Sequence, residues 1–302
     1  MNKKALIIGF GSIGQKHAHL LSRILGEENI SLLTSRDDVN FRRVDSLDEA
    51  AKSGFDYYVV ACETSRHYDL VKEIEDKIRD KLVLIEKPLF DTQKEISLEK
   101  NDYFVGYNLR FHPLLIRLRD LIESEDVISA NIICNSYLPN WRENINYEDS
   151  SSANKDKGGG VLLDLSHEID FLIYLVGNIS YGFSYNRKIS SLQINTDDVL
   201  FLNGSFQKNG LYSIYLNYFS NNLKRLIMLE TKDASYELDF LNSKLKIYSQ
   251  GKLKELKREN FNFNSTYNLM HKAILSRKFD GLCTISEAQK TMSIIRDIQE
   301  SR

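Results

Sequence analysis

The chain has 302 residues, of which 42% are hydrophobic, and its 40 basic and 42 acidic side chains give a formal net charge of -2. This length allows two ordinary domains with separate cores, and the balanced charge excludes the basic surface that binding to a nucleic-acid backbone requires. No apolar stretch approaches the roughly 20 residues of a membrane-spanning helix, and no signal peptide is recognisable, so a soluble globular protein is expected.

The first hundred residues alternate short, mostly apolar runs with amphipathic segments. Such runs are typical of parallel strands that are buried on both faces. They are residues 4–8, 30–33, 57–61 and 82–85. Between them, residues 13–25 and 65–78 repeat apolar side chains at helical spacing. Because strands and helices alternate, the pattern predicts a doubly wound parallel sheet.

The pattern changes after residue 106. An alternating strand is predicted at 127–137, a polar, aromatic-bearing loop at 139–157 and a helix at 161–176. Successive antiparallel strands follow up to residue 249, with a hairpin turn at Asn209-Gly210. The other predicted elements are helices at 114–122, 267–276 and 286–300 and strands at 199–206, 211–219, 226–230, 236–241 and 245–248.

A glycine-rich turn joins the first predicted strand to the first predicted helix. Gly9, Gly11 and Gly14 fit the pattern G-x-G-x-x-G, in which glycines permit a tight turn and the helix amino terminus faces the pyrophosphate of a dinucleotide. Ser12 and Ile13 lie inside the turn and complete the predicted cofactor contacts. The alternative is a glycine-rich turn without a ligand.

The end of the second predicted strand bears on the choice of dinucleotide. An acidic residue that binds the ribose 2'-hydroxyl is usual there, about 20 residues after the glycines. This chain has a hydroxyl and a guanidinium instead, at Ser35 and Arg36, which suit a 2'-phosphate and favour NADP(H). Asp37 and Asp38 are close enough to leave NAD(H) open, and Arg36 could equally be a solvated loop charge.

A cation directly follows the predicted strand 82–85, in the stretch Glu86-Lys87-Pro88. In an open α/β sheet, ligands bind outside the carboxyl ends of the strands. Lys87 is therefore predicted to point at a ligand. The alternative is a lysine at the strand edge that interacts with Glu86.

Three consecutive glycines precede the predicted helix 161–176. Asp164, His167 and Asp170 are predicted to lie on one side of it, opposite an apolar stripe, so that they can face a cleft. At i,i+3, Asp164 can contact His167, which would raise the pKa of the imidazole and suit it to proton transfer. The alternative is a surface helix with an Asp–His pair.

Polar residues elsewhere are candidate substrate ligands. Trp141 and Arg142, in the polar loop, offer an aromatic platform and a cation to a polyhydroxylated molecule. Arg110, Arg142 and His112 could hold a phosphate or carboxylate, which would favour an acidic or nucleotide-linked sugar. Asn108 follows a strand of the first half and is a candidate neighbour of the substrate or the nicotinamide. The alternative is a set of solvated side chains.

Taken together, these motifs resemble the glucose-fructose oxidoreductase, inositol dehydrogenase and MocA (Gfo/Idh/MocA) family of NAD(P)-dependent enzymes. The resemblance rests on their order and intervals along the whole chain. The motifs are Gly9 to Gly14 followed by Lys16-His17, Thr64-Ser65-Arg66-His67, Glu86-Lys87-Pro88, Gly106-Tyr107-Asn108-Leu109-Arg110-Phe111-His112-Pro113, and the triple glycine with Asp164 and His167.

The resemblance implies a Rossmann domain, assigned here to residues 1–107, and an α/β domain with a large, mostly antiparallel open sheet over residues 108–302. The closing helix 284–301 can pack back toward the first domain. Catalysis is implied in a cleft between the domains, as is a cis peptide bond before Pro88.

The resemblance also implies roles for individual residues. Lys87 matches the catalytic lysine, Asp164 the carboxylate that binds and orients the substrate, and His167 the acid/base. Thr64, His67, Glu86 and Lys87 fall at cofactor-binding positions. One departure concerns Asp164: family members commonly place the aspartate and histidine four residues apart, and here the interval is three.

The resulting hypothesis is an NAD(P)-dependent oxidoreductase that acts on a hydroxyl or carbonyl carbon of a sugar, cyclitol or nucleotide-linked sugar, with His167 as acid/base and Lys87 stabilising the alkoxide. Two alternatives remain open. One is a non-enzymatic dinucleotide sensor of the same fold, and the other is an enzyme that uses tightly bound NAD in an internal redox cycle.

The expected partner is a small sugar-like substrate, with no nucleic acid and no membrane. Strands 211–219 and 226–230 carry apolar side chains on both faces, so self-association through the sheet is expected, as a homodimer or homotetramer. Cys62, Cys134 and Cys283 lie far apart without metal-ligand spacing, so no metal site is expected and a reducing cytoplasm is the predicted location.

Overall fold

The computed structural model describes residues 3–142 and 146–301 and divides into two compact units. Unit 1 comprises Met1–Asn108 and Asn264–Gln289, and unit 2 comprises Leu109–Phe263 and Lys290–Arg302. The predicted boundary assigns all of 108–302 to the second domain, and this is corrected for 264–289, which pack within unit 1. In the predicted loop 139–157, residues 143–145 lie outside the described residues.

Unit 1 contains a seven-stranded sheet in the order β15-β6-β5-β4-β1-β2-β3. All neighbouring pairs are parallel except β15 with β6, so the predicted doubly wound parallel sheet is confirmed. Its core is formed by β1, β4 and β5, whose residues are all buried. The strands are β1 Ala5–Ile8, β2 Ile30–Leu33, β3 Arg42–Arg43, β4 Tyr57–Val60, β5 Leu82–Ile85, β6 Asp102–Val105 and β15 Cys283–Thr284.

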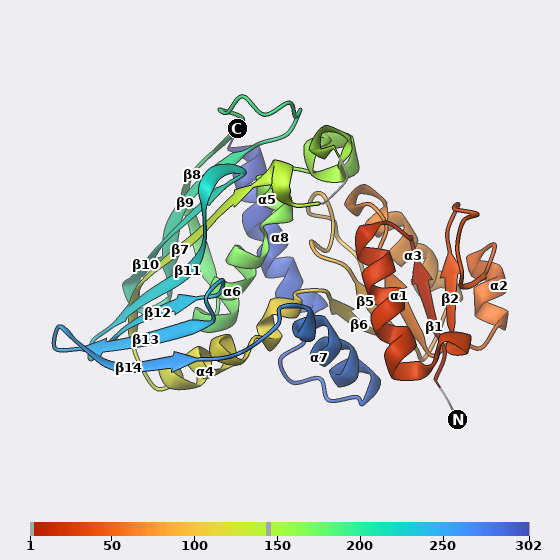
Figure 1. Cartoon of the computed structure of the whole chain (residues 1–302), viewed down its shortest axis with the longest axis horizontal. Helices are drawn as coiled ribbons and strands as arrows, with labels where there is room; N and C mark the ends of the chain where they lie inside the picture. Colours follow the sequence, from red (N-terminus) through yellow and green to blue (C-terminus); the bar gives the residue numbers. More distant parts are fainter. Residues whose placement is uncertain (1–2, 143–145, 302) are drawn as a thin grey trace. The chain divides into compact units, whose positions relative to one another are not determined.

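Helices pack against this sheet and are drawn beside it in Figure 1. They are α1 Ser12–Leu25, α2 Leu47–Lys52, α3 His67–Lys77 and α7 Asn264–Leu275, with short 3-10 turns η1 Glu27–Asn29 and η2 Thr64–Arg66. The buried side of α1 includes His17, Ala18 and Leu21. The sequence pattern missed α2 and β3 because both are too short to show a period.

Unit 2 contains an eight-stranded sheet in the order β14-β13-β12-β11-β7-β10-β9-β8. Neighbouring strands are antiparallel except β7 and β10, which are parallel, so the mostly antiparallel sheet is confirmed. The strands are β7 Val127–Tyr137, β8 Ile179–Arg187, β9 Val199–Phe206, β10 Gly210–Asn217, β11 Phe219–Thr231, β12 Ser235–Asp239, β13 Lys244–Ser249 and β14 Lys252–Arg258. Edge strand β14 was missed because lysines interrupt its apolar pattern.

The predicted hairpin between β9 and β10 forms, but its turn lies one residue earlier than predicted. Gly210 pairs with Phe206 and begins β10, with a φ of -66°. The left-handed conformation falls instead on Lys208 and Asn209, with φ of 60° and 62°. Asparagine tolerates this conformation better than most residues, which explains why position 209 needs no glycine.

Helices of unit 2 lie along one face of its sheet, and Figure 1 shows α5 and α6 there, with no described helix of the unit on the opposite face. The helices are α4 Pro113–Ile122, α5 Val161–Asp164, α6 His167–Val176 and the greater part of α8 Ile285–Glu300. The 3-10 turns are η3 Asn108–Phe111, η4 Leu138–Asn140, η5 Tyr147–Asp149, η6 Ser151–Ala153, η7 Lys155–Lys157 and η8 Gln207–Asn209. No helix among the described residues is long and apolar enough to cross a membrane.

The predicted continuous helix 161–176 is wrong in one respect, because it is interrupted after Asp164. Leu165 leaves the helical conformation, with φ -100° and ψ 30°, and His167 begins a second helix. The first turn of α6 is buried together with its polar residues Glu168 and Asp170. The predicted polar side of the helix is therefore not open to a cleft at Asp170.

Candidate functional site

The glycine-rich turn has the shape that a bound pyrophosphate requires. A Cβ on Gly14 would lie 2.2 Å from the carbonyl oxygen of Gly9, so the turn closes too tightly for a side chain there. A Cβ on Gly11 would meet no described atom within 4 Å apart from its chain neighbours, and no side chain of a described residue caps α1 at Gly11. The open space over the start of α1 fits an anionic group of a dinucleotide.

The loop after β2 places a cation beside this turn. Nη1 of Arg36 donates to the carbonyl oxygen of Phe10 at 3.4 Å. Its Nε and Nη2 donate to the Asp38 carboxylate at 3.1 and 2.9 Å, and both side chains are largely exposed. Ser35 is exposed next to it. Arg36 is thus adjacent to the predicted cofactor turn, and a surface carboxylate pairs with it.

Lys87 directly follows the buried strand β5, and the peptide bond between Lys87 and Pro88 is cis, as the resemblance implied. The backbone N–H of Lys87 donates to Oε2 of Glu86 at 3.3 Å. His67 contacts the residues that follow, because its Nδ1 lies 3.2 Å from the carbonyl oxygens of Pro88 and Leu89. Burial lowers the pKa of His67, so the ring is neutral and holds the backbone beyond Lys87 in place.

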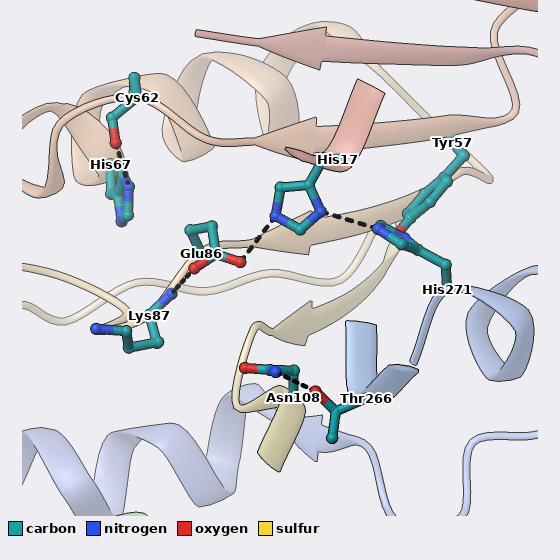
Figure 2. A network of polar contacts seen from close by, with 9 residues as sticks. All are labelled: His17, Tyr57, Cys62, His67, Glu86, Lys87, Asn108, Thr266 and His271. Carbon is teal, nitrogen blue, oxygen red and sulfur yellow. Dashed lines mark hydrogen bonds and ion pairs between the residues drawn. The ribbon is translucent and has the colours of Figure 1, made fainter. Parts of the chain in front are cut away.

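A row of buried polar side chains extends from Glu86 into unit 1, and Figure 2 shows its members pointing toward one another. Oε1 of Glu86 lies 2.9 Å from Nε2 of His17. Nδ1 of His17 lies 2.8 Å from Nε2 of His271, and Nδ1 of His271 lies 2.9 Å from the hydroxyl of Tyr57. The row therefore joins α1, β4, α7 and the end of β5.

In unit 2, the carboxylate of Asp164 is held by a tyrosine at the start of the turn between β10 and β11. The hydroxyl of Tyr218 donates to Oδ2 of Asp164 at 2.5 Å. Burial and the nearby carboxylate raise the pKa of Tyr218 well above its usual value, so the phenol stays a donor. Trp141 packs edge-on against the Tyr218 ring at 5.1 Å between centroids. Tyr218 is buried, whereas Asp164 and Trp141 are half-buried, so the carboxylate and the indole are the parts of this cluster that could contact a hydroxylated ligand.

The triple glycine before α5 serves close packing inside unit 2. A Cβ on Gly159 would lie 2.1 Å from the carbonyl oxygen of Ser151, and a Cβ on Gly160 would lie 2.7 Å from Oδ1 of Asp197. Asp197 also accepts the backbone N–H of Leu162 at 3.0 Å. The close approach that requires glycine at these two positions is therefore made by this chain's own residues.

His167 is buried at the start of α6 and belongs to an aromatic stack. Its ring stacks on Phe171 at 6.0 Å between centroids, and Phe171 stacks on Phe240 at 5.0 Å. Phe240 in turn contacts the ring of His112 at 5.1 Å. These rings hold the imidazole of His167 in a defined orientation.

Comparison with known proteins identifies the first part of the chain. Residues 3–98 match the model of the oxidoreductase family with an NAD-binding Rossmann fold, GFO_IDH_MocA. This segment matches the NAD-binding Rossmann domain of that family. The match includes the glycine-rich turn and Lys87, which confirms the resemblance for this domain. A comparison of the sequence with curated proteins gives no significant match.

Solved structures extend the similarity in fold to the whole chain. Each of three covers 100% of this chain and at least 94% of its own. They are UDP-N-acetylglucosamine 3-dehydrogenase GnnA from Acidithiobacillus ferrooxidans (15% identity, TM-score 0.79, 98% of that chain), levoglucosan dehydrogenase in complex with NADH (15%, 0.83, 97%) and GenD2 from gentamicin A biosynthesis in complex with NAD (17%, 0.78, 94%). At these identities the comparison establishes the Rossmann domain and the second, mostly antiparallel domain.

Several residues of this first domain are placed differently from the sequence prediction. The carboxylate of Glu86 is turned inward to His17 and is 5% exposed, so it does not face a ligand. His67 is buried between backbone carbonyl oxygens rather than open to a cofactor, whereas Thr64 is half-buried at the start of η2. Asn108 is buried and donates to Oγ1 of Thr266 at 2.5 Å, which ties the end of β6 to α7.

The prediction that Arg110 binds substrate disagrees with its placement. Its guanidinium is 1% exposed and donates from Nε and Nη2 to the Asp170 carboxylate, at 2.9 and 2.7 Å. His112 caps α4 through Nδ1 and is also buried, which lowers its pKa to about 4. Neither side chain is open to an anionic substrate group, whereas Arg142 remains half-buried beside Trp141.

Three residues of these networks were missed by sequence reasoning: Tyr57, His271 and Tyr218. Tyr57 lies in a strand, His271 in a helix and Tyr218 between two strands, all in apolar surroundings where an aromatic or histidine ring normally indicates core packing. Their partners are between 54 and 254 residues away along the chain. No local spacing could have indicated them.

Proposed function

We propose that the chain is an NAD(P)-dependent oxidoreductase that transfers a hydride between nicotinamide and a CH–OH carbon of a sugar, cyclitol or nucleotide-linked sugar. The observation that carries this proposal is the position of Lys87. It follows β5 at the carboxyl edge of the parallel sheet that also carries the glycine-rich turn, where ligands of such sheets bind. Structures of similar fold include dehydrogenases of levoglucosan and of a nucleotide-linked sugar.

The residues then have separate roles. The nicotinamide, when bound, accepts or supplies the hydride. His167 takes up or returns the proton of the reacting hydroxyl, and Lys87 stabilises the alkoxide oxygen by its charge. Asp164 orients the substrate, and Tyr218 fixes the direction of that carboxylate. Trp141 and Arg142 offer an apolar platform and a cation to the rest of the sugar.

Replacement of the two proposed catalytic residues tests the function. With a panel of sugars, cyclitols and nucleotide sugars, the unmodified protein is expected to reduce NAD or NADP. Lys87→Met and His167→Asn are each expected to lower kcat by at least about 100-fold because they remove charge stabilisation and proton transfer. Lys81→Met, a change of the same type just before β5, is the matched control and is expected to keep full activity.

Turnover that survives in the double variant would contradict the assignment of Lys87 and His167. Dinucleotide binding without turnover on any member of the panel would favour a sensor of the same fold. Copurified NAD that never exchanges would favour an internal redox cycle instead.

NADP(H) is the proposed cofactor, with NAD(H) as the alternative. Arg36 contacts the backbone of the glycine-rich turn and could pair with a 2'-phosphate there. Its exposed pair with Asp38 is of a kind worth about 0–1 kcal/mol, so a phosphate could displace that carboxylate at small cost.

Arg36→Ala is therefore expected to weaken NADPH binding by roughly 10- to 100-fold, the loss of one charge-assisted contact, and NADH binding by less than about threefold. Fluorescence titration of both dinucleotides measures this. Arg43→Ala removes a similar exposed pair, with Asp37, and is the control. Equal losses for both dinucleotides in Arg36→Ala would overturn the preference for NADP(H).

We also propose that the open face of the unit 2 sheet forms a homo-oligomer, either a dimer or a tetramer. Tyr185, Phe201 and Tyr215 are directly paired across β8, β9 and β10, and Ile133 and Leu226 continue the row across β7 and β11. Tyr185 is 41% and Phe201 47% exposed, an unusual amount for neighbouring aromatic rings. Light scattering is expected to give the unmodified protein a mass that is a multiple of 35.0 kDa. The Phe201→Glu variant is expected to have a mass of 35.0 kDa. A monomeric unmodified protein would contradict this proposal.

A further inference from the structure

The buried row of side chains behind Lys87 has a feature that the proposed reaction does not use. Tyr57 begins β4 and His271 lies in α7, yet both are joined to Glu86 through His17 by three contacts of 2.8–2.9 Å. Tyr57, His17 and His271 are 0% exposed and Glu86 is 5% exposed. Figure 2 shows the four side chains in sequence, ending at the backbone of Lys87.

With Glu86 ionised and His17 neutral, the chemistry of these groups sets a single direction for the hydrogen bonds. An ionised Glu86 can only accept, so Nε2 of His17 carries a proton and donates to it. In a neutral ring Nδ1 of His17 is then an acceptor, and Nε2–H of His271 must donate to it. That leaves Nδ1 of His271 as the acceptor for the hydroxyl of Tyr57. Every donor points toward Glu86, and the row contains one net charge.

The opposite direction would require a second charge or a protonated carboxyl group. Burial lowers the pKa of His271 well below its usual value, so His271 stays neutral. Burial and the negative charge of Glu86 raise the pKa of Tyr57, so its hydroxyl keeps its proton. Both shifts agree with a row of neutral donors that ends on a carboxylate.

The carboxylate at the end of the row is fixed on its other sides as well. Its second oxygen, Oε2, accepts the backbone N–H of Lys87 at 3.3 Å. A Cβ on Gly106 would lie 2.8 Å from Oε1, so the lack of a side chain at Gly106 leaves space for the Glu86 carboxylate. A change in the orientation of Glu86 would therefore move the backbone from which the Lys87 side chain extends.

We propose that Tyr57, His271 and His17 form a one-directional hydrogen-bond relay that holds Glu86 as a buried carboxylate and thereby positions Lys87. The three are positioning residues, and the catalytic part of this inference rests on the proposed function. A buried carboxylate needs such donors, because an ion without them costs several kcal/mol in a medium of low polarity. The donors come from three elements, so the relay also makes the position of Lys87 depend on α1, β4 and α7 together.

The direction of the relay can be tested without any substrate. In protein labelled with nitrogen-15 at histidine, long-range proton–nitrogen NMR distinguishes the two neutral tautomers and the charged ring. His17 and His271, assigned by the loss of their signals in His17→Gln and His271→Gln, are expected to be neutral and protonated at Nε2. A proton at Nδ1 of either ring, or a charged ring, at pH 7 would overturn the relay.

Two variants of His271 separate positioning from packing. His271→Phe keeps an aromatic ring but removes both hydrogen-bonding functions, whereas the side-chain amide of His271→Gln can donate to His17 and accept from Tyr57. His271→Phe is expected to lower kcat about tenfold, by misplacement of Lys87, with dinucleotide affinity unchanged, and His271→Gln is expected to restore most of kcat. Tyr57→Phe loses only the hydroxyl and so removes a single hydrogen bond of the relay. It replaces His271→Phe in the test if that variant does not fold.

A second readout keeps this test separate from the proposed reaction. The carbon-13 signal of Lys87 Cε, assigned with Lys87→Met, is expected to shift in His271→Phe and in Tyr57→Phe and to stay in place in His271→Gln. If the Lys87 signal shifts in His271→Phe and Tyr57→Phe but not in His271→Gln, and no sugar is turned over, the relay stands and the proposed function fails. If the signal and kcat are the same in all three variants, the relay does not position Lys87.

Discussion

Replacing Arg110 by methionine is expected to lower the free energy of unfolding by about 3–5 kcal/mol, the largest effect on stability of any change considered for this protein. The guanidinium and the Asp170 carboxylate are 1% and 0% exposed and share two hydrogen bonds of 2.9 and 2.7 Å. Without Arg110, Asp170 loses this bidentate partner inside the core of unit 2. Urea denaturation followed by circular dichroism measures the loss.

Two comparisons distinguish the buried pair from a general effect of losing a charge. Arg277→Met breaks an exposed pair with Asp102 and is expected to cost less than about 1 kcal/mol. The double replacement Arg110→Met with Asp170→Leu removes both charges, and it is expected to recover much of the stability that the single change loses. A single Arg110→Met variant that unfolds within about 1 kcal/mol of the unmodified protein would contradict this account.

The buried pair also shows why the sequence interpretation of Arg110 failed. An arginine between a strand and a helix, beside Asn108 and His112, has the composition of an anion site. Its partner lies 60 residues further on, on a helix whose polar side was predicted to face a cleft. A helical period indicates which residues share a side, but it does not indicate whether a second arginine or sheet covers that side. The pair of Arg225 with Glu168, at 2.7 Å, covers α6 in the same way.

Other parts of the fold could be predicted because the physical signal is local. Strand 82–85 is observed as predicted, since a strand buried on both faces must be apolar throughout. Strand 127–137 also has its predicted bounds. The helix break after Asp164 has no such signal, because Leu165 continues the apolar period through the residue at which the backbone turns.

The residues of the candidate site also differ in whether their sequence signal is local. The glycine-rich turn and Lys87 are local to strand ends, and they were found from the sequence. The relay joins positions 17, 57, 86 and 271, which only the folded chain brings together. A histidine on the buried side of α1 and a tyrosine in β4 each indicate core packing when taken alone.

Replacing Gly11 by alanine is expected to weaken NADH and NADPH binding by at least about 100-fold, the loss of about two hydrogen bonds to a charged group, with little effect on folding. The backbone of Gly11 has φ -73° and ψ -169°, which alanine adopts without strain. No described atom beyond its chain neighbours lies within 4 Å of the added Cβ, so the methyl group would occupy only the space predicted for the pyrophosphate. Fluorescence titration with each dinucleotide measures the affinity, and thermal denaturation measures stability.

Gly14→Ala is the contrasting variant, because its Cβ would lie 2.2 Å from the carbonyl oxygen of Gly9 and must displace the backbone. It is expected to lose stability as well as affinity, whereas Gly11→Ala is expected to keep its free energy of unfolding within about 0.5 kcal/mol. Only Gly11→Ala therefore tests what lies over the turn independently of how the turn folds. Unchanged dinucleotide affinity in a stable Gly11→Ala protein would mean that the pyrophosphate does not bind at the start of α1.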